Sequence, residues 1–199
     1  MNDDESLRLF FAIPVPQSFF EHIYRIQDIF SSSGTIIWRP TQEHQFHLTL
    51  LFLGELSRSL LPRLLEKANR VLHWSEEVSL EQRGVSQFPM TQSRKPPKII
   101  HVQFARCPAL EVLRKKLQDS LSALPLKKNR KSFIPHLTLG RVKKLQNSYK
   151  FEKLLTEINC AGLGNGQSIP VKEIILFESE LKPSGAVYHE IQAFPLVTG

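Results

Sequence analysis

Cysteine and long apolar runs are both scarce in this sequence of 199 residues. Its two cysteines, Cys107 and Cys160, have no CxxC spacing, which argues against a disulfide framework and against a cysteine-rich zinc site. The apolar run over residues 9–15 is too short for a membrane span or an export signal. The first five residues, MNDDE, are acidic where a secretory signal is basic. We therefore expect a cytoplasmic protein that does not enter a membrane.

Linker-like segments are missing as well. No block of Ser, Gly or like charge is long enough to form a disordered linker. Hydrophobic residues make up 41% of the chain, which is enough to bury a substantial core. We therefore interpret residues 1–199 as a single domain.

Acidic side chains are absent from one long stretch. The chain has 26 Lys and Arg against 19 Asp and Glu, a formal net charge of +7, and this favours polyanionic partners. No carboxylate side chain occurs between Asp119 and Glu152, so we expect a local positive field there, although a solvated basic loop would look the same. The basic residues of this stretch are Lys127, Lys128, Arg130, Lys131, Arg141, Lys143, Lys144 and Lys150.

Hydrophobic periodicity predicts alternating strands and helices along the whole chain. Apolar or alternating segments predict strands over residues 7–14, 45–54, 78–88, 99–104, 133–142, 170–180 and 186–195. Spacings of three and four predict helices over residues 18–30, 60–72, 109–121 and 151–158. Residues 182–185, Lys-Pro-Ser-Gly, suit a hairpin turn between the last two strands. The order strand, helix, strand, helix, strand occurs twice, which suggests an internal duplication.

The tetrapeptide His-Leu-Thr-Leu occurs at residues 47–50 and again at 136–139, at matching positions of the two halves. Side chains alternate between the faces of a strand, so His47 and Thr49 share one face, as do His136 and Thr138. If the halves pack about a pseudo-twofold axis, two imidazoles and two hydroxyls meet in a central cleft.

Such a group of side chains is suited to hydrolysis of a cyclic phosphodiester. One histidine can take a proton from water and the other can give one to the leaving oxygen, and both titrate near neutral pH. Hydroxyls two residues away can contact the phosphate oxygens. A single His on an apolar strand is often structural, and histidine is also a common zinc ligand. Burying four polar groups without a purpose is costly, and the sequence has no His-x-x-x-His pair, so we favour metal-free acid/base chemistry.

The sequence resembles the RNA 2',3'-cyclic phosphodiesterase family, also described as 2'-5' RNA ligases, of the 2H phosphoesterase superfamily. The resemblance covers nearly the full length. It rests on RLFFAI at residues 8–13, HLTLLFLGE at 47–55, Phe88-Pro89, RKP at 94–96, IPHLTLGRV at 134–142 and the closing residues 176–195, which contain SELKPSGAVYHEI.

The resemblance implies an α+β fold of two lobes, each an antiparallel sheet with outer helices, around a central active-site cleft. It implies that His47 donates a proton to the leaving 3' oxygen and that His136 accepts one from water, which gives a 2'-phosphomonoester. Thr49 and Thr138 would contact the phosphate, with no metal and no cofactor. The substrates would be RNA ends with a 2',3'-cyclic phosphate, with tRNA fragments or nucleotides as candidates, and we expect a monomer.

Two residues stay open at this level. Arg141 matches an Arg found after the second motif in the family, but its odd offset from His136 places it on the opposite face unless Gly140 hosts a bulge. Phe11 is either a core residue, which we expect, or a stacking surface for the terminal base. The direction of reaction, hydrolysis or 2'-5' ligation, is also open, and a non-catalytic RNA-binding module that uses the basic stretch remains an alternative.

Overall fold

The computed structural model describes residues 6–90, 95–126, 132–163, 166–183 and 185–198. The basic residues Lys127, Lys128, Arg130 and Lys131 lie outside the described residues, so the first half of the predicted basic stretch has no structural account. None of the helices in the described ranges is long and apolar enough to cross a membrane.

The described residues form strands and helices close to those that the sequence predicts. The strands are β1 (Ser6–Pro14), β2 (Ile36–Pro40), β3 (His47–Ser57), β4 (Val78–Phe88), β5 (Ile99–Phe104), β6 (His136–Leu145), β7 (Ser168–Val171), β8 (Glu173–Lys182) and β9 (Gly185–Pro195). The helices are α1 (Phe20–Ser32), α2 (Leu61–Leu72), α3 (Pro108–Ser120) and α4 (Ser148–Cys160). Short 3₁₀ turns are η1 (Gln17–Phe19), η2 (Glu43–Gln45) and η3 (Arg58–Leu60).

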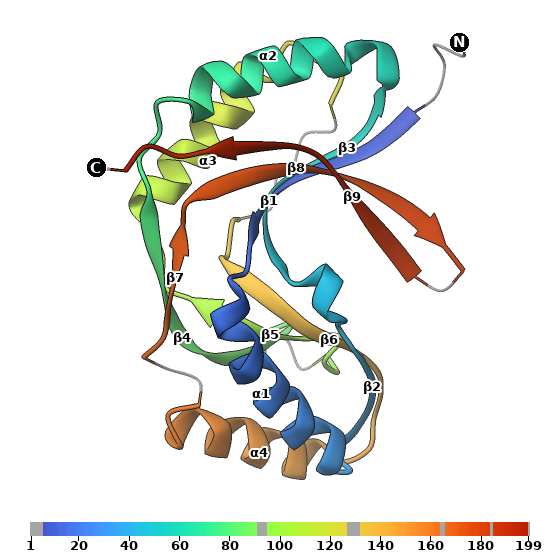
Figure 1. Ribbon diagram of the computed structural model, residues 1–199. Coiled ribbons are helices and arrows are strands. Elements are labelled where there is room, and N and C mark those ends of the chain that lie inside the picture. The colour runs from blue at the N-terminus through green and yellow to red at the C-terminus, as the bar shows by residue number, and fades with distance from the viewer. Residues whose placement is uncertain (1–5, 91–94, 127–131, 164–165, 184, 199) are drawn as a thin grey trace.

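The strands form one curled antiparallel sheet in the order β7-β4-β5-β6-β3-β1-β8-β9, and β2 pairs with β6. Figure 1 shows α2 and α3 together at one end of the molecule and α1 and α4 together at the other. The sheet therefore has two lobes, β3-β1-β8-β9 and β7-β4-β5-β6 with β2, which confirms the predicted α+β class and bilobal architecture.

The lobes do not coincide with the two halves of the sequence. β4 belongs to the first half but pairs with β5 and β7, and β8 belongs to the second half but pairs with β1. Likewise, one helix of each half covers each lobe (Figure 1). The two halves have thus exchanged their last strands, so each lobe depends on the whole chain.

Two details of the predicted strands differ from the structure. The strand expected over residues 170–180 is divided at Lys172 into β7, which pairs with β4, and β8, which pairs with β1. The apolar pattern continues through this break because both segments carry buried apolar side chains, so periodicity does not reveal the change of lobe. The structure also has β2, a five-residue edge strand ending in Pro40, which is too short for a clear alternating pattern.

Most of the buried hydrophobic side chains form one cluster between the sheet and the helices. α1 contributes Ile23, Ile26 and Phe30, each 0% exposed, because its apolar residues recur at helical spacing. Phe11 in β1 is also 0% exposed, and the centroid of its ring lies 6.0 Å from that of Phe194. Phe11 is therefore a core residue and does not present a face to a nucleobase, as expected.

Candidate active site

The two repeated motifs meet where the lobes join. β3 and β6 are antiparallel neighbours, and Leu48 pairs with Leu137, so the second residues of the two motifs are partners. Both leucines are buried, so the residues on either side of them point to the opposite face of the sheet. In this register His47 lies opposite Thr138 and Thr49 lies opposite His136. The structure therefore brings all four predicted side chains to one face, and each is partly exposed.

The ring of His47 is held by hydrogen bonds at both nitrogens. Nδ1 donates to the carbonyl oxygen of Gln45 at 2.8 Å, because a carbonyl can only accept. Nε2 lies 3.1 Å from the Thr49 hydroxyl oxygen. The proton on Nδ1 leaves Nε2 as the nitrogen that exchanges a proton on the open face.

His136 has the same backbone anchor. Its Nδ1 donates to the carbonyl oxygen of Ile134 at 2.7 Å, two residues earlier, as in the first motif. The tautomer is thereby fixed, and the lone pair of the neutral ring is on Nε2. Both imidazoles thus present the same nitrogen for proton transfer.

Aromatic rings enclose each of the two imidazoles. The centroid of the His47 ring lies 5.1 Å from that of Phe10. It also lies 5.1 Å from the centroid of Tyr188, whose ring it meets edge-to-face. The His136 ring contacts Phe88 at 4.9 Å and His101 at 5.3 Å. Sequence reasoning gave these four neighbours no role, although Phe10, Phe88 and Tyr188 lie in segments that carry the family resemblance. His101 carried no signal.

Burial lowers the pKa of both motif histidines. The pKa of His47 falls to about 4, mainly because burial disfavours the charged ring; the Gln45 carbonyl opposes this and a charge on His136 adds to it. Burial also lowers the pKa of His136, against the opposing hydrogen bond to Ile134. Both rings are therefore neutral at pH 7 in the free protein.

These lowered pKa values predict a protein that is destabilised by mild acid. Burial also lowers the pKa of His101 to about 3 and that of His22 below its usual value. Below pH 6.5 these histidines bind protons in the unfolded chain but stay neutral in the folded protein. Their contribution to the free energy of unfolding is therefore fully present above pH 6.5 and is lost as the pH falls toward 4. At about 1.4 kcal/mol per pKa unit and group, we expect the free energy of unfolding to fall by several kcal/mol.

Urea denaturation at pH 7 and pH 4 measures this difference. The control is His44→Gln, which changes an exposed histidine and should leave the pH dependence as it is in the wild type. Equal free energies of unfolding at the two pH values would contradict the lowered pKa values.

A bulge in β6 determines the direction of Arg141. The register between β5 and β6 shifts between the Ile100 and His101 positions, where β6 has one residue more. Leu139 and Gly140 are both buried, and a Cβ on Gly140 would lie 2.5 Å from the Trp38 ring on the helix side. The exposed side chain of Arg141 therefore lies on the face that carries His136. Burial raises the pKa of the Tyr188 hydroxyl, and the positive charge of Arg141 opposes this rise. The ring of Tyr188 contacts His47.

The first motif has a matching bulge. The register between β1 and β3 shifts between the Phe11 and Ala12 positions, where β3 has one residue more. Phe52 then lies on the same face as His47 and is 56% exposed. It is paired with Phe10, whose ring contacts both Phe52 at 6.0 Å and His47 at 5.1 Å. An exposed aromatic ring thus occupies in β3 the position that Arg141 occupies in β6.

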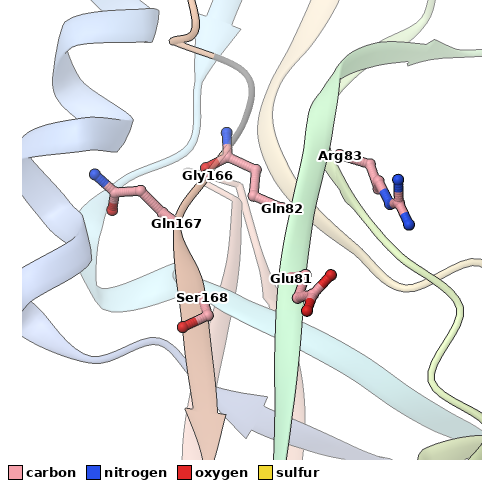
Figure 2. A pocket seen from close by; sticks show the side chains of 6 residues that line it. All are labelled: Glu81, Gln82, Arg83, Gly166, Gln167 and Ser168. Atoms are coloured by element: carbon pink, nitrogen blue, oxygen red, sulfur yellow. The ribbon is translucent and has the colours of Figure 1, made fainter.

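A separate pocket of about 550 Å³ lies away from the motifs, where β4 meets the start of β7. Figure 2 shows that its polar side chains point in different directions, with Gln82 and Gln167 on one side of β4 and Arg83 on the other. The pocket therefore brings no group of side chains to a common point. Among the described residues, no cluster of three or more His, Cys, Asp or Glu side chains could hold a metal ion.

Comparison with known families gives a match over most of the chain. The model of the 2'-5' RNA ligase superfamily matches residues 16–180, which include both motifs. The chain belongs to this superfamily. Curated relatives of this superfamily member include a protein of Methanothermobacter thermautotrophicus, 29% identical over 96% of the chain and 99% of the relative. A Thermus thermophilus protein is 31% identical over 96% of the chain and 90% of the relative. Both relatives are named RNA 2',3'-cyclic phosphodiesterase.

Solved structures agree with the membership of the 2'-5' RNA ligase superfamily. A crystal structure of a Thermus thermophilus protein superimposes with a TM-score of 0.77 at 26% identity, covering 96% of this chain and 98% of that one. Escherichia coli LigT, crystallised with 3'-AMP, superimposes with a TM-score of 0.72 at 23% identity, covering 96% and 99%. At 23% identity, the similarity to Escherichia coli LigT concerns the fold alone.

Proposed function

We propose that this protein hydrolyses the 2',3'-cyclic phosphate at RNA ends to a 2'-phosphomonoester. The observation that carries the proposal is the convergence of His47, Thr49, His136 and Thr138 on one face where β3 meets β6. The names of the curated relatives support the same reaction and substrate. The nearby Arg141 is suited to a phosphate oxygen, since guanidinium groups form paired hydrogen bonds with phosphate.

The reaction uses the two imidazoles on opposite sides of the phosphorus atom. His136 accepts a proton from water at Nε2 while the water oxygen attacks phosphorus. The bond from phosphorus to the 3' oxygen breaks, and His47 gives that oxygen a proton from Nε2. The product is a 2'-phosphate beside a free 3'-hydroxyl. The two rings have then exchanged their protonation states, and solvent restores them.

His47 must be protonated to act as the acid, although its pKa is about 4 in the free protein. A phosphodiester carries a negative charge, and an anion within a few ångströms of a buried imidazole favours the charged ring. The substrate therefore raises the pKa of the histidine that protonates it. The hydroxyl of Thr49 lies beside Nε2 of His47, and Thr138 holds the matching position in the second motif. Both hydroxyls are suited to donate to the oxygens on which charge develops.

The decisive experiment uses a short RNA that ends in a 2',3'-cyclic phosphate. The purified protein, incubated with EDTA, should convert this end to a 2'-monophosphate, because the proposed mechanism has no metal. Absence of turnover at micromolar protein, both with EDTA and with added Mg²⁺, Mn²⁺ or Zn²⁺, would refute the proposal. Turnover only with a metal would refute the metal-free mechanism and retain the substrate.

The same side chains also serve 2'-5' ligation, because a catalyst of hydrolysis also catalyses attack by a 5'-hydroxyl in place of water. The superfamily description favours this second candidate function. An RNA with a cyclic phosphate end, mixed with an excess of a 5'-hydroxyl RNA, distinguishes the two by the ratio of joined to hydrolysed product.

For the physiological setting we propose one cytoplasmic, monomeric domain that acts on tRNA fragments or nucleotides.

Phe52 is suited to stack a base of the substrate, because an exposed aromatic ring accepts any nucleobase. Phe52→Ala is expected to weaken the binding of 2'-AMP roughly 5- to 160-fold, since stacking contributes about 1–3 kcal/mol per base. Binding of ribose 2-phosphate, which lacks the base, should not change. Isothermal titration calorimetry measures both ligands.

The matched control is Tyr149→Ala, which removes an aromatic ring that is 76% exposed on α4. This variant should bind both ligands like the wild type. Equal losses for the two ligands in Phe52→Ala, or no loss for 2'-AMP, would exclude a stacking role.

A further inference from the structure

His101 in β5 is a third histidine beside the two motif histidines. It lies opposite Thr138 of β6 and opposite Ser86 of β4, so its side chain shares their face of the sheet. Its ring stacks on Phe88, with centroids 4.1 Å apart and an angle of 18° between the planes. It meets the ring of His136 at 5.3 Å and an angle of 71°.

The imidazole of His101 destabilises the folded protein relative to an apolar ring that only packs in the core. The side chain is 0% exposed, and neither ring nitrogen has a hydrogen-bond partner among the described residues. One of these nitrogens carries a hydrogen, and a buried unpaired donor destabilises the folded state. By contrast, the buried ring of His22 is hydrogen-bonded to Gln82 at 2.9 Å. A hydrocarbon ring would fill the place of His101 without this cost, so packing alone does not explain the imidazole.

The neighbour whose charged form the polar ring of His101 can stabilise is His136. His136 changes from neutral to charged when it accepts a proton, and burial opposes that charge. His101 stays neutral throughout, because burial lowers its pKa to about 3. A neutral imidazole has one nitrogen with a lone pair, whose partial negative charge favours a cation in contact with it. A charge on His136 lowers the pKa of His47 on β3 and of His101 on β5, and Arg141 is a cation on the same face of β6.

We propose that His101 is a positioning residue for His136, which fixes the plane of that ring and stabilises its charged form through a neutral imidazole. The inference rests on the proposed function, in which His136 becomes charged during turnover. His101 is enclosed by Phe88 and His136 and does not reach the substrate, so it acts on the chemical step and not on binding.

His101→Phe keeps a stacked ring and removes both nitrogens. We expect the melting temperature to rise, because two unpaired polar atoms leave the core. The pKa of His136, followed by NMR titration of labelled imidazoles, should fall by about half a unit or more. The acid limb of the pH profile of kcat/KM should shift to lower pH. We expect kcat to be about 3- to 10-fold lower than in the wild type and KM to stay within about twofold of the wild-type value.

The control is His22→Phe, which changes a buried histidine on α1 away from the motifs. Its His136 pKa and pH profile should be those of the wild type, whatever its stability. An unchanged His136 pKa in His101→Phe would overturn the proposal and leave His101 a packing residue. If His101→Phe does not fold, His101→Leu is measured in the same way and decides. The NMR titration needs no turnover, so a wild type without phosphodiesterase activity refutes the proposed function and still tests His101.

Discussion

Replacing His47 or His136 by alanine is expected to lower turnover of a 2',3'-cyclic phosphate about 10²- to 10⁴-fold in each case. Each change removes one of the two proton transfers, and no other described imidazole of this face is exposed enough to replace it, since His101 is 0% exposed. KM should change far less than kcat, because the proposed phosphate contacts of the threonines and Arg141 are kept in both variants. Single-turnover kinetics on a short RNA with a cyclic phosphate end measure the chemical step directly.

His44→Ala is the matched control, since His44 is exposed and lies three residues before His47. Its turnover should equal that of the wild type. The two alanine variants also separate an enzyme from a non-catalytic RNA-binding module. A binding module would show no activity to lose and nearly unchanged RNA affinity in both variants, and that result would refute the acid/base assignment.

Arg141→Ala is expected to lower kcat/KM about 10²-fold, because it removes a charged donor from the phosphate oxygens that gain charge in the transition state. Arg141→Lys should recover only part of this loss, since an ammonium group lacks the paired donors of a guanidinium. The comparison is made at one fixed ionic strength, because salt screens the interaction of exposed charges with RNA.

Lys150→Ala removes the same charge from α4 and serves as the control. If net charge alone attracted the RNA, Lys150→Ala and Arg141→Ala would reduce kcat/KM by similar factors. That outcome would show that Arg141 does not contact the reacting phosphate. A loss confined to Arg141→Ala is the expected result.

The sequence predicted most of the secondary structure because periodicity is a local property. The spacing of Ile23, Ile26 and Phe30 indicated α1, and strand alternation around Leu48 and Leu137 indicated the two motif strands. Alternation also determined that each histidine shares a face with its threonine. It did not reveal β2, and it did not reveal that the apolar segment around Lys172 changes lobes, because a pattern of burial does not specify the pairing partner.

The direction of Arg141 shows the limit of local patterns most clearly. Simple alternation directs it away from His136, and only the register against β5 establishes the extra residue between Thr138 and Gly140 of β6. The equivalent bulge in β3 brings Phe52 to the His47 face, and nothing in the sequence indicated this. A bulge is recognised from two strands together, so one strand read alone gives the wrong parity beyond it.

By itself, the sequence determined the two His-x-Thr pairs, because an alternating strand and a repeated tetrapeptide are legible in the order of residues. The fold class came from the resemblance of the sequence to a known family. Only the tertiary structure decided that the pairs face one another in register, which rings surround each imidazole, and that His101 is enclosed against His136. Those facts depend on contacts between segments far apart in the chain, and such contacts are selected by the packing of the whole sheet.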